Sequence, residues 1–145
     1  MQSLITAVII GLIGGVAIAA QAPMSSSISQ NTGNLESIFI IHIGGAIAAG
    51  IPLLLMKGGD LRNIGTVPVY ALFGGVLGLL VVGSINYAIP RVGVAPTLGL
   101  TIMGQLLAGL LLDHFGLLGL PVKSITPTQI TGAVILLLGG WLVIK

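Results

Sequence analysis

The sequence contains no cysteine and very little charge. The absence of cysteine excludes disulfide bonds, a thiolate nucleophile and any metal site built from thiolates. Only 6% of the 145 residues are Asp, Glu, Lys or Arg, whereas a soluble domain has about 25%. A small soluble domain must cover its surface with polar groups. A chain with 55% hydrophobic residues and a mean hydropathy of +1.17 therefore has lipid as its main solvent.

The scarcity of charge also limits the function classes. Five Lys/Arg and three Asp/Glu give a net charge of +2, and no basic cluster is present that would bind nucleic acid. The sequence shows no hydrolytic triad, no pair of catalytic carboxylates, no phosphate-binding loop and no histidines at metal-ligand spacing. We therefore expect neither an enzyme nor a protein that binds a cofactor or a metal.

Long apolar runs are what the chain has instead. A membrane-spanning helix needs about 20 predominantly apolar residues. Five segments meet this requirement: residues 3–29, 35–56, 67–89, 94–113 and 128–144. Nearly all the charges lie between these segments, with Glu36 alone at the edge of a span. We predict an all-α membrane protein in which residues 1–145 form one domain of five transmembrane helices. It would be a multi-pass protein of a bacterial inner membrane.

A proline within the first segment and another directly after the third should affect their helices. The apolar run from Leu4 to Ala20 lacks the basic start of a signal peptide, so we interpret it as a retained membrane helix. We expect this helix to bend near Pro23 and the third helix to stop at Pro90.

Lys and Arg are shared almost evenly between the two membrane faces. Five spans put the termini on opposite faces, so Lys57, Arg62 and Lys123 lie on the N-terminal face. Arg91 and Lys145 lie on the C-terminal face. So small a bias is expected of a chain that inserts in both orientations and pairs with an antiparallel copy of itself. Alternatively, a partner or the insertion machinery fixes a single orientation.

Polar side chains within the predicted spans gather in the half nearest the C-terminal face, and polar groups at membrane depth are candidates for function. The candidate substrate-binding residues are Gln21, His42, Asn86, Tyr87 and Gln105, the last near mid-depth. Glu36 and His42 are the candidates for proton coupling. An antiparallel copy would supply the same groups from the other face, which would complete a path with its site near the midplane.

Each candidate also has a structural interpretation. Gln21 could satisfy carbonyls freed by the nearby proline, and His42 could bond a neighbouring helix. The carboxylate of Glu36 could be stabilised by the partial positive charge at the N-terminus of the second helix. Asn86 and Tyr87 could satisfy the backbone before Pro90, and tyrosine is also a common interfacial anchor. The sequence alone leaves both interpretations open.

Several short motifs resemble one known family. They are Gln21-Ala22-Pro23, His42-Ile43-Gly44-Gly45, Val92-Gly93-Val94-Ala95, Gly104-Gln105-Leu106-Leu107-Ala108 and Leu112-Asp113-His114-Phe115-Gly116. Through them nearly the whole chain resembles the YdcZ-like family of the drug/metabolite transporter superfamily. The resemblance implies five-helix units that work in antiparallel pairs, as homodimers, heterodimers or fused copies, and an inner-membrane exporter of unspecified substrate. Relatives commonly carry arginines where this chain has residues 25–31, so a heterodimer with a paralogue stays open.

We therefore expect a secondary-type transporter that exports a small organic or cationic solute by alternating access between two antiparallel protomers. Its partners would be the lipid bilayer, a second copy or a paralogue, and a small-molecule substrate, with no nucleic acid. One alternative is a small dual-topology ion channel, which would pass ions at rates far above those of an alternating-access cycle. The other is an accessory or scaffold subunit, which would show no flux.

Overall fold

The computed structural model describes residues 2–56 and 60–145, and every regular element in these ranges is a helix. Five of its helical segments are long and apolar enough to cross a membrane. They are Leu4–Thr32, Asn34–Leu55, Val69–Val92, Val94–Phe115 and Pro127–Ile144. The predicted all-α fold with five membrane-spanning helices is confirmed. Lys57, which the charge count assigned to the N-terminal face, lies outside the described residues.

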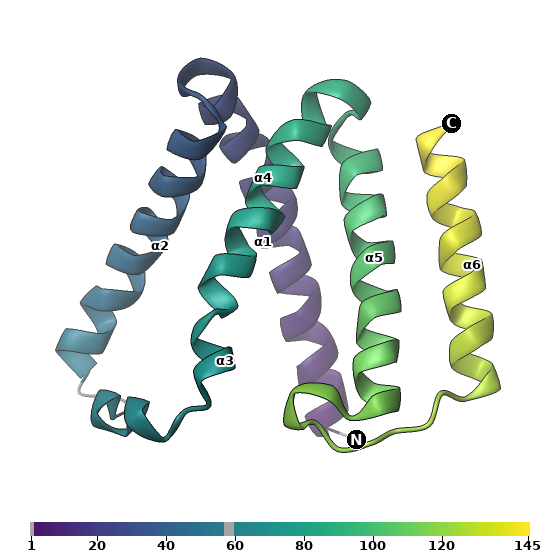
Figure 1. Cartoon of the computed structure of the whole chain (residues 1–145). Helices are drawn as coiled ribbons and strands as arrows, with labels where there is room; N and C mark the ends of the chain where they lie inside the picture. The colour runs from purple at the N-terminus through teal and green to yellow at the C-terminus, as the bar shows by residue number, and fades with distance from the viewer. Residues whose placement is uncertain (1, 57–59) are drawn as a thin grey trace. The chain divides into compact units, whose positions relative to one another are not determined.

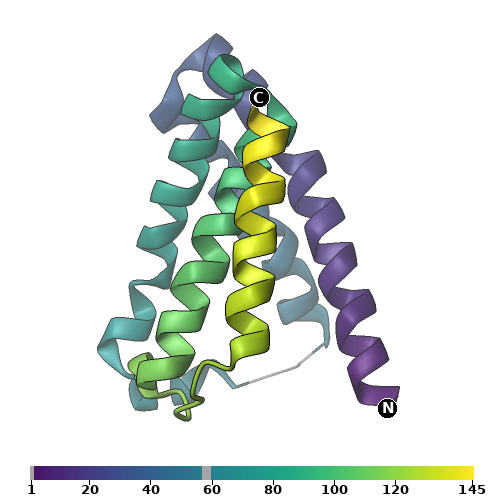
Figure 2. The same ribbon diagram turned by 90° about the vertical axis from the view of Figure 1, so that its right-hand side faces the viewer.

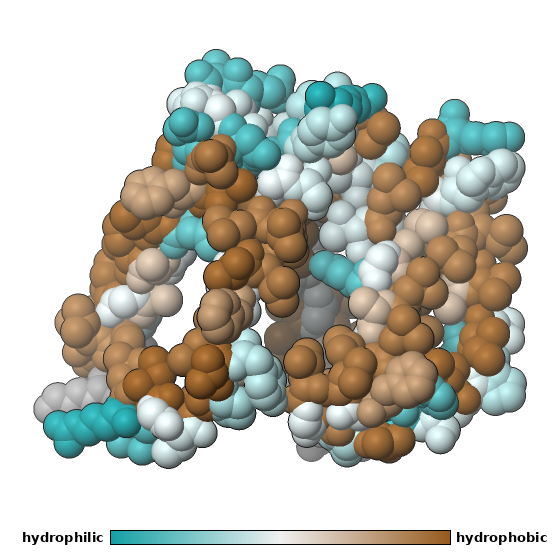
Figure 3. All heavy atoms as spheres, viewed as in Figure 1, coloured by the Kyte–Doolittle hydropathy of each residue, from teal (hydrophilic) through white to brown (hydrophobic). Residues whose placement is uncertain are grey.

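The chain divides into two compact units, Met1–Pro90 and Arg91–Lys145, and each is described by itself. The first unit contains α1 (Gln2–Thr32), α2 (Asn34–Met56), the short 3₁₀ helix η1 (Leu61–Thr66), α3 (Val69–Leu72) and α4 (Gly74–Val92), whose last turn passes the boundary. In Figure 3, hydrophobic side chains cover the middle of α2 and α4, and hydrophilic ones gather where α1 meets α2.

Helix α1 runs through Pro23 and through the polar run that follows it, ending at Thr32 rather than near residue 29. The polar side chains bond carbonyls of their own helix one turn back. Asn31 Nδ2 donates to the Ser27 carbonyl at 2.8 Å, and Thr32 Oγ1 donates to the Ile28 carbonyl at 2.9 Å. Because these groups are satisfied within the helix, the polar run does not end it. With 31 residues, α1 is about 46 Å long, which exceeds a hydrocarbon core of about 30 Å.

Gly33 is the single residue between α1 and α2, and its φ of +114° lies where residues with a side chain are strained. A Cβ at this position would also collide with the carboxylate of Glu36. We expect Gly33→Ala to lower the stability of the folded protein by about 1–3 kcal/mol. Thermal unfolding of the purified protein measures the loss. Gly14→Ala, at a mid-helix site with open space around it, is the matched control and should leave stability unchanged or slightly raised.

The third predicted helix, residues 67–89, is broken in the structure. α3 ends at Leu72, Phe73 donates its N–H to the Tyr70 carbonyl at 3.2 Å, and α4 begins at Gly74. The break is visible between α3 and α4 in Figure 1. The bond from Phe73 to Tyr70 spans three residues, whereas an α-helical bond spans four. The glycine pair Gly74-Gly75 that follows has low helix propensity, so both features account for the interruption. α4 then continues past Pro90 to Val92.

The second unit contains α5 (Val94–Phe115), the 3₁₀ turn η2 (Leu117–Gly119) and α6 (Pro127–Ile144). Both ribbon views show α5 and α6 side by side and antiparallel (Figures 1 and 2). Met103 of α5 packs directly against Gly140 of α6, so the glycine allows the two helices to approach closely. α6 begins with a capping box, in which Thr126 and Gln129 bond each other's backbone N–H groups.

Candidate functional site

The most buried side chains of the first unit are polar. Ser25, Ser26, Ser37 and Asn86 are each 3% exposed or less. The buried hydrophobic residues of this unit, among those described, are Ala22, Ile38 and Ile85. A few apolar side chains thus surround a set of hydroxyl and amide groups where three helices meet. Small residues let helices in a membrane approach closely, and interhelical hydrogen bonds then add to the packing.

Three of these residues and Asn34 form one hydrogen-bonded set, here called the three-helix network: Ser25, Asn34, Ser37 and Asn86. Ser25 Oγ donates to Asn86 Oδ1 at 2.7 Å, and Asn86 Nδ2 donates to Asn34 Oδ1 at 2.9 Å. Ser37 Oγ donates to the backbone carbonyl of Ser25 at 2.7 Å. The network therefore joins α1 to α2 through Ser37, and joins α4 to both of them through the single side chain of Asn86.

The turn at Gly33 sets the register of the network. Ser37 N–H bonds the Gly33 carbonyl at 3.1 Å, so Ser37 lies in the first turn of α2 with its side chain on α1. Asn34 and Ile38 lie one turn apart on α2 and face α4, because both side chains lie close to Gly83 of that helix. Asn86 was a predicted site residue, whereas Asn34 and Ser37 were not. The available signal was small polar residues directly after a glycine that lies between two long apolar runs.

Gln21 lies one helical turn before Ser25 on α1, and its side chain is exposed. It lines a cavity of about 20 Å³ between α1 and α4, together with Ala22, Ser25 and Ile85. A cavity of this size holds about one water molecule when polar partners are near. Gln21 thus lies next to Ser25 of the three-helix network on α1, one helical turn further from Gly33.

His42 lies two helical turns after Asn34 on α2. Its Nδ1 is 2.8 Å from the Ile38 carbonyl oxygen of its own helix. A carbonyl oxygen only accepts, so Nδ1 donates the hydrogen of this bond. The ring lines a groove of about 270 Å³ between α2 and α4. The structural interpretation of His42 was a bond to a neighbouring helix, whereas the ring bonds the Ile38 carbonyl of its own helix.

The other candidates, Tyr87, Glu36 and Gln105, are exposed. Tyr87 follows Asn86 on α4 and is 61% exposed. Glu36 is exposed in the first turn of α2, with its carboxylate beside Gly33, where the helix N-terminus favours a negative charge. Gln105 is exposed on α5 and belongs to the other unit. Within the ranges that the structure describes, no group of three or more His, Asp or Glu side chains could hold a metal ion.

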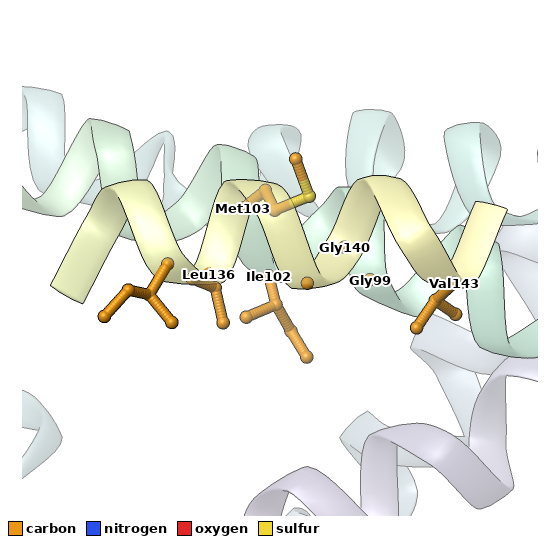
Figure 4. Close-up of a pocket in the computed structure, with 8 residues that line it drawn as sticks. Gly99, Ile102, Met103, Leu136, Gly140 and Val143 are labelled. Atoms are coloured by element: carbon orange, nitrogen blue, oxygen red, sulfur yellow. The ribbon is translucent and has the colours of Figure 1, made fainter. Parts of the chain in front are cut away.

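The second unit has a larger groove of about 450 Å³ between α5 and α6. Its lining is apolar, and Ile102, Leu136 and Val143 project to the same side of the helix pair in Figure 4. Gly99 and Gly140 also line the groove, and Gly140 faces Met103 of α5. The groove offers no hydrogen-bonding side chain, in contrast to the groove beside His42.

Five apolar helices with one buried polar network define a polytopic membrane protein. The family model described as "Putative inner membrane exporter, YdcZ" matches residues 6–142 of the chain. The chain belongs to this family, as its motifs had indicated, and is a multi-pass inner-membrane protein. It is 27% identical over 147 aligned residues to the inner membrane protein YdcZ of Escherichia coli (strain K12), covering 99% of this chain and 97% of the relative. No solved structure matches it. The description of the family is that of a membrane exporter.

Proposed function

We propose that this chain exports a small organic solute by alternating access, at a site shared by two antiparallel protomers. The observation that supports this most directly is the three-helix network, with Gln21 and His42 exposed one or two turns deeper along α1 and α2. Polar groups at these depths are costly in lipid, so a role in solute passage is the favoured explanation.

The depth of the polar groups follows from helix geometry. His42 is eight residues beyond Asn34, which is about 12 Å along α2, and Gln21 is eleven residues before Thr32, about 17 Å along α1. Both lie inside a hydrocarbon core of about 30 Å. Beyond His42, α2 carries no polar side chain up to Leu55, and α4 carries none from Gly74 to Gly83. One protomer thus provides polar groups from one face to about mid-depth.

An antiparallel copy would provide the same groups from the opposite face. The even division of Lys and Arg supports this arrangement, because it allows both orientations to insert. Two such protomers would rock around a site near the midplane, where polar groups of both copies meet. Glu36 and His42 stay the candidates for proton coupling in that cycle.

Proteoliposomes containing the purified protein test the proposal. They would be loaded with a mixture of amines, alcohols and other small organic solutes, and solute loss would be followed by mass spectrometry against protein-free liposomes. We expect at least one solute to leave at a rate that saturates with its concentration. Potassium chloride conductance at channel rates in planar bilayers would contradict alternating access. An absence of any protein-dependent loss would favour an accessory subunit.

Gln105 provides a separate test of the proposed lining. Gln105→Leu should lower the export rate about tenfold, because one intramembrane polar contact with the solute contributes about 1–2 kcal/mol. Crosslinking should show the same amount of dimer as in the parent protein, since the substitution adds an apolar side chain to an exposed face of α5. Unchanged export would remove Gln105 from the lining.

A further inference from the structure

The loop between α5 and α6 begins with a run of residues whose side chains can neither donate nor accept a hydrogen bond. They are Gly116-Leu117-Leu118-Gly119-Leu120-Pro121-Val122, here called the apolar loop. Its three leucines and its valine are 43–69% exposed, although the loop lies outside the membrane-spanning helices α5 and α6. A concentration of exposed apolar side chains outside the spans indicates an interaction surface.

The apolar loop is closed and packed against itself. Lys123 N–H donates to the Asp113 carbonyl at 2.8 Å, which joins the chain on either side of the loop. Gly116 has a φ of +60°, and a Cβ there would lie 2.6 Å from Val122 Cγ2, so the first and last residues of the loop are also in close contact. Both ribbon views show the loop beside the end of α5 (Figures 1 and 2). The exposed leucines are therefore presented by a compact unit rather than by an extended linker.

The backbone of the loop is suited to a region with little water. Gly116 N–H donates to the Leu112 carbonyl, the C-terminal bond of α5. Leu120 N–H donates to the Leu117 carbonyl at 3.2 Å, and Pro121 has no N–H to satisfy. Unsatisfied backbone groups are costly in lipid, so this internal bonding lowers the cost of moving the loop out of water.

Leu118 has an unusual backbone conformation for a residue with a large side chain. Its φ of +57° and ψ of +27° lie in the left-handed region, and its side chain is 63% exposed. Strained conformations persist where the surroundings hold them, and they often mark functional positions. Contact with lipid would hold Leu118 in this conformation, because removal of an apolar side chain from water is favourable.

The position of the loop and the charges beside it favour lipid over protein as the partner. α5 has 22 residues and is about 33 Å long, so a helix that crosses a hydrocarbon core of about 30 Å brings the loop to the edge of the core. Asp113 and Lys123 flank the loop, where charged groups can reach the lipid head groups. Protein interfaces have about one hydrogen bond per 100–200 Å², and the side chains of the loop can supply none.

We propose that the apolar loop inserts into the bilayer at the boundary between head groups and acyl chains, with Leu117, Leu118 and Leu120 in contact with lipid. The loop thereby anchors the α5–α6 pair at the membrane face on which it lies. This lipid contact belongs to the second unit alone, so it does not depend on the function proposed above.

The test uses single-cysteine variants of the full-length protein in liposomes, labelled with a nitroxide. Paramagnetic resonance measures collisions of the label with oxygen, which concentrates in hydrocarbon, and with a polar nickel chelate present on both sides of the membrane. We expect the oxygen-to-nickel collision ratio to be about tenfold higher for Leu118→Cys than for Asn63→Cys, because hydrocarbon excludes polar solutes. Asn63 is exposed in η1, in the polar loop on the same predicted membrane face.

Two outcomes would overturn the proposal. Equal ratios at the two positions would mean that the apolar loop lies in water. Low collision rates of the Leu118→Cys label with both reagents would mean that protein, such as a second copy of the chain, covers the loop. Leu117→Cys repeats the measurement at a neighbouring leucine of the loop and should give the same high ratio.

Two glycine substitutions test whether the closed form of the loop places it in lipid. Gly116→Ala should lower the ratio measured at Leu118→Cys, because the new methyl group collides with Val122 and opens the loop. Gly109→Ala on α5, with open space around it, should leave the ratio unchanged. A ratio that stays high in Gly116→Ala would overturn the role of loop closure.

Discussion

Asn86→Leu is expected to lower the stability of the folded protein by about 2 kcal/mol and to reduce export at least tenfold. Asn86 makes both bonds that join α4 to the other two helices of the network, to Ser25 at 2.7 Å and to Asn34 at 2.9 Å. Each interhelical bond contributes about 1 kcal/mol, and leucine replaces neither. Thermal unfolding should show a decrease in Tm of about 5–10 °C. Proteoliposome export of the identified solute measures the second effect.

Ser84→Leu is the matched control for Asn86→Leu. Ser84 lies two residues away on α4, is exposed, and bonds only the Val81 carbonyl of its own helix. Its replacement should leave both Tm and export close to those of the parent protein. Equal effects of the two substitutions would mean that the network has no special role. A loss of export with unchanged stability would place Asn86 in the solute path rather than in the scaffold.

Ser37→Leu is expected to have the largest effect on folding. Ser37 is 0% exposed, and its hydroxyl bonds the Ser25 carbonyl across the α1–α2 contact. A leucine there would force the two helices apart and remove that bond, at a combined cost of about 3 kcal/mol. Fluorescence-detected size-exclusion chromatography of the detergent extract should show mainly aggregated protein. Ser37→Ala, which loses only the bond, should stay folded and lose about 1 kcal/mol.

Ser27→Leu tests whether burial rather than the residue type causes this effect. Ser27 lies on α1 two residues after Ser25, and its side chain is exposed. The same substitution at this position should give a normal monodisperse peak, because leucine there meets no buried neighbour. Aggregation of Ser27→Leu to the same extent would contradict the account of α1–α2 packing.

The five spans could be predicted because composition alone determines them. Apolar runs of about 20 residues with almost no charge have few alternatives to membrane helices. The finer limits depend on local bonds that the residue pattern does not reveal. The continuation of α1 to Thr32 depends on side chains such as Asn31 bonding their own helix, and the break at Phe73 depends on a bond of three-residue spacing.

The candidate site was predicted in part. Asn86 was recognisable because a polar amide within an apolar membrane helix is a candidate for a functional role. Its partners Asn34 and Ser37 were not, because they lie at the predicted edge of α2 and their register depends on the geometry of Gly33. The ring nitrogen of His42 that donates to the backbone could not be predicted either, because it depends on the side-chain rotamer that places Nδ1 beside the Ile38 carbonyl.

The orientation of the chain in the membrane is the most direct test of the central claim, an antiparallel pair with a shared path. Single cysteines at Asn63, in η1, and at Val92, at the end of α4, would be labelled from outside intact cells with a membrane-impermeant maleimide. The sequence has no cysteine, so the parent protein gives no background. The account predicts comparable labelling at both positions. Labelling at only one of them would contradict it.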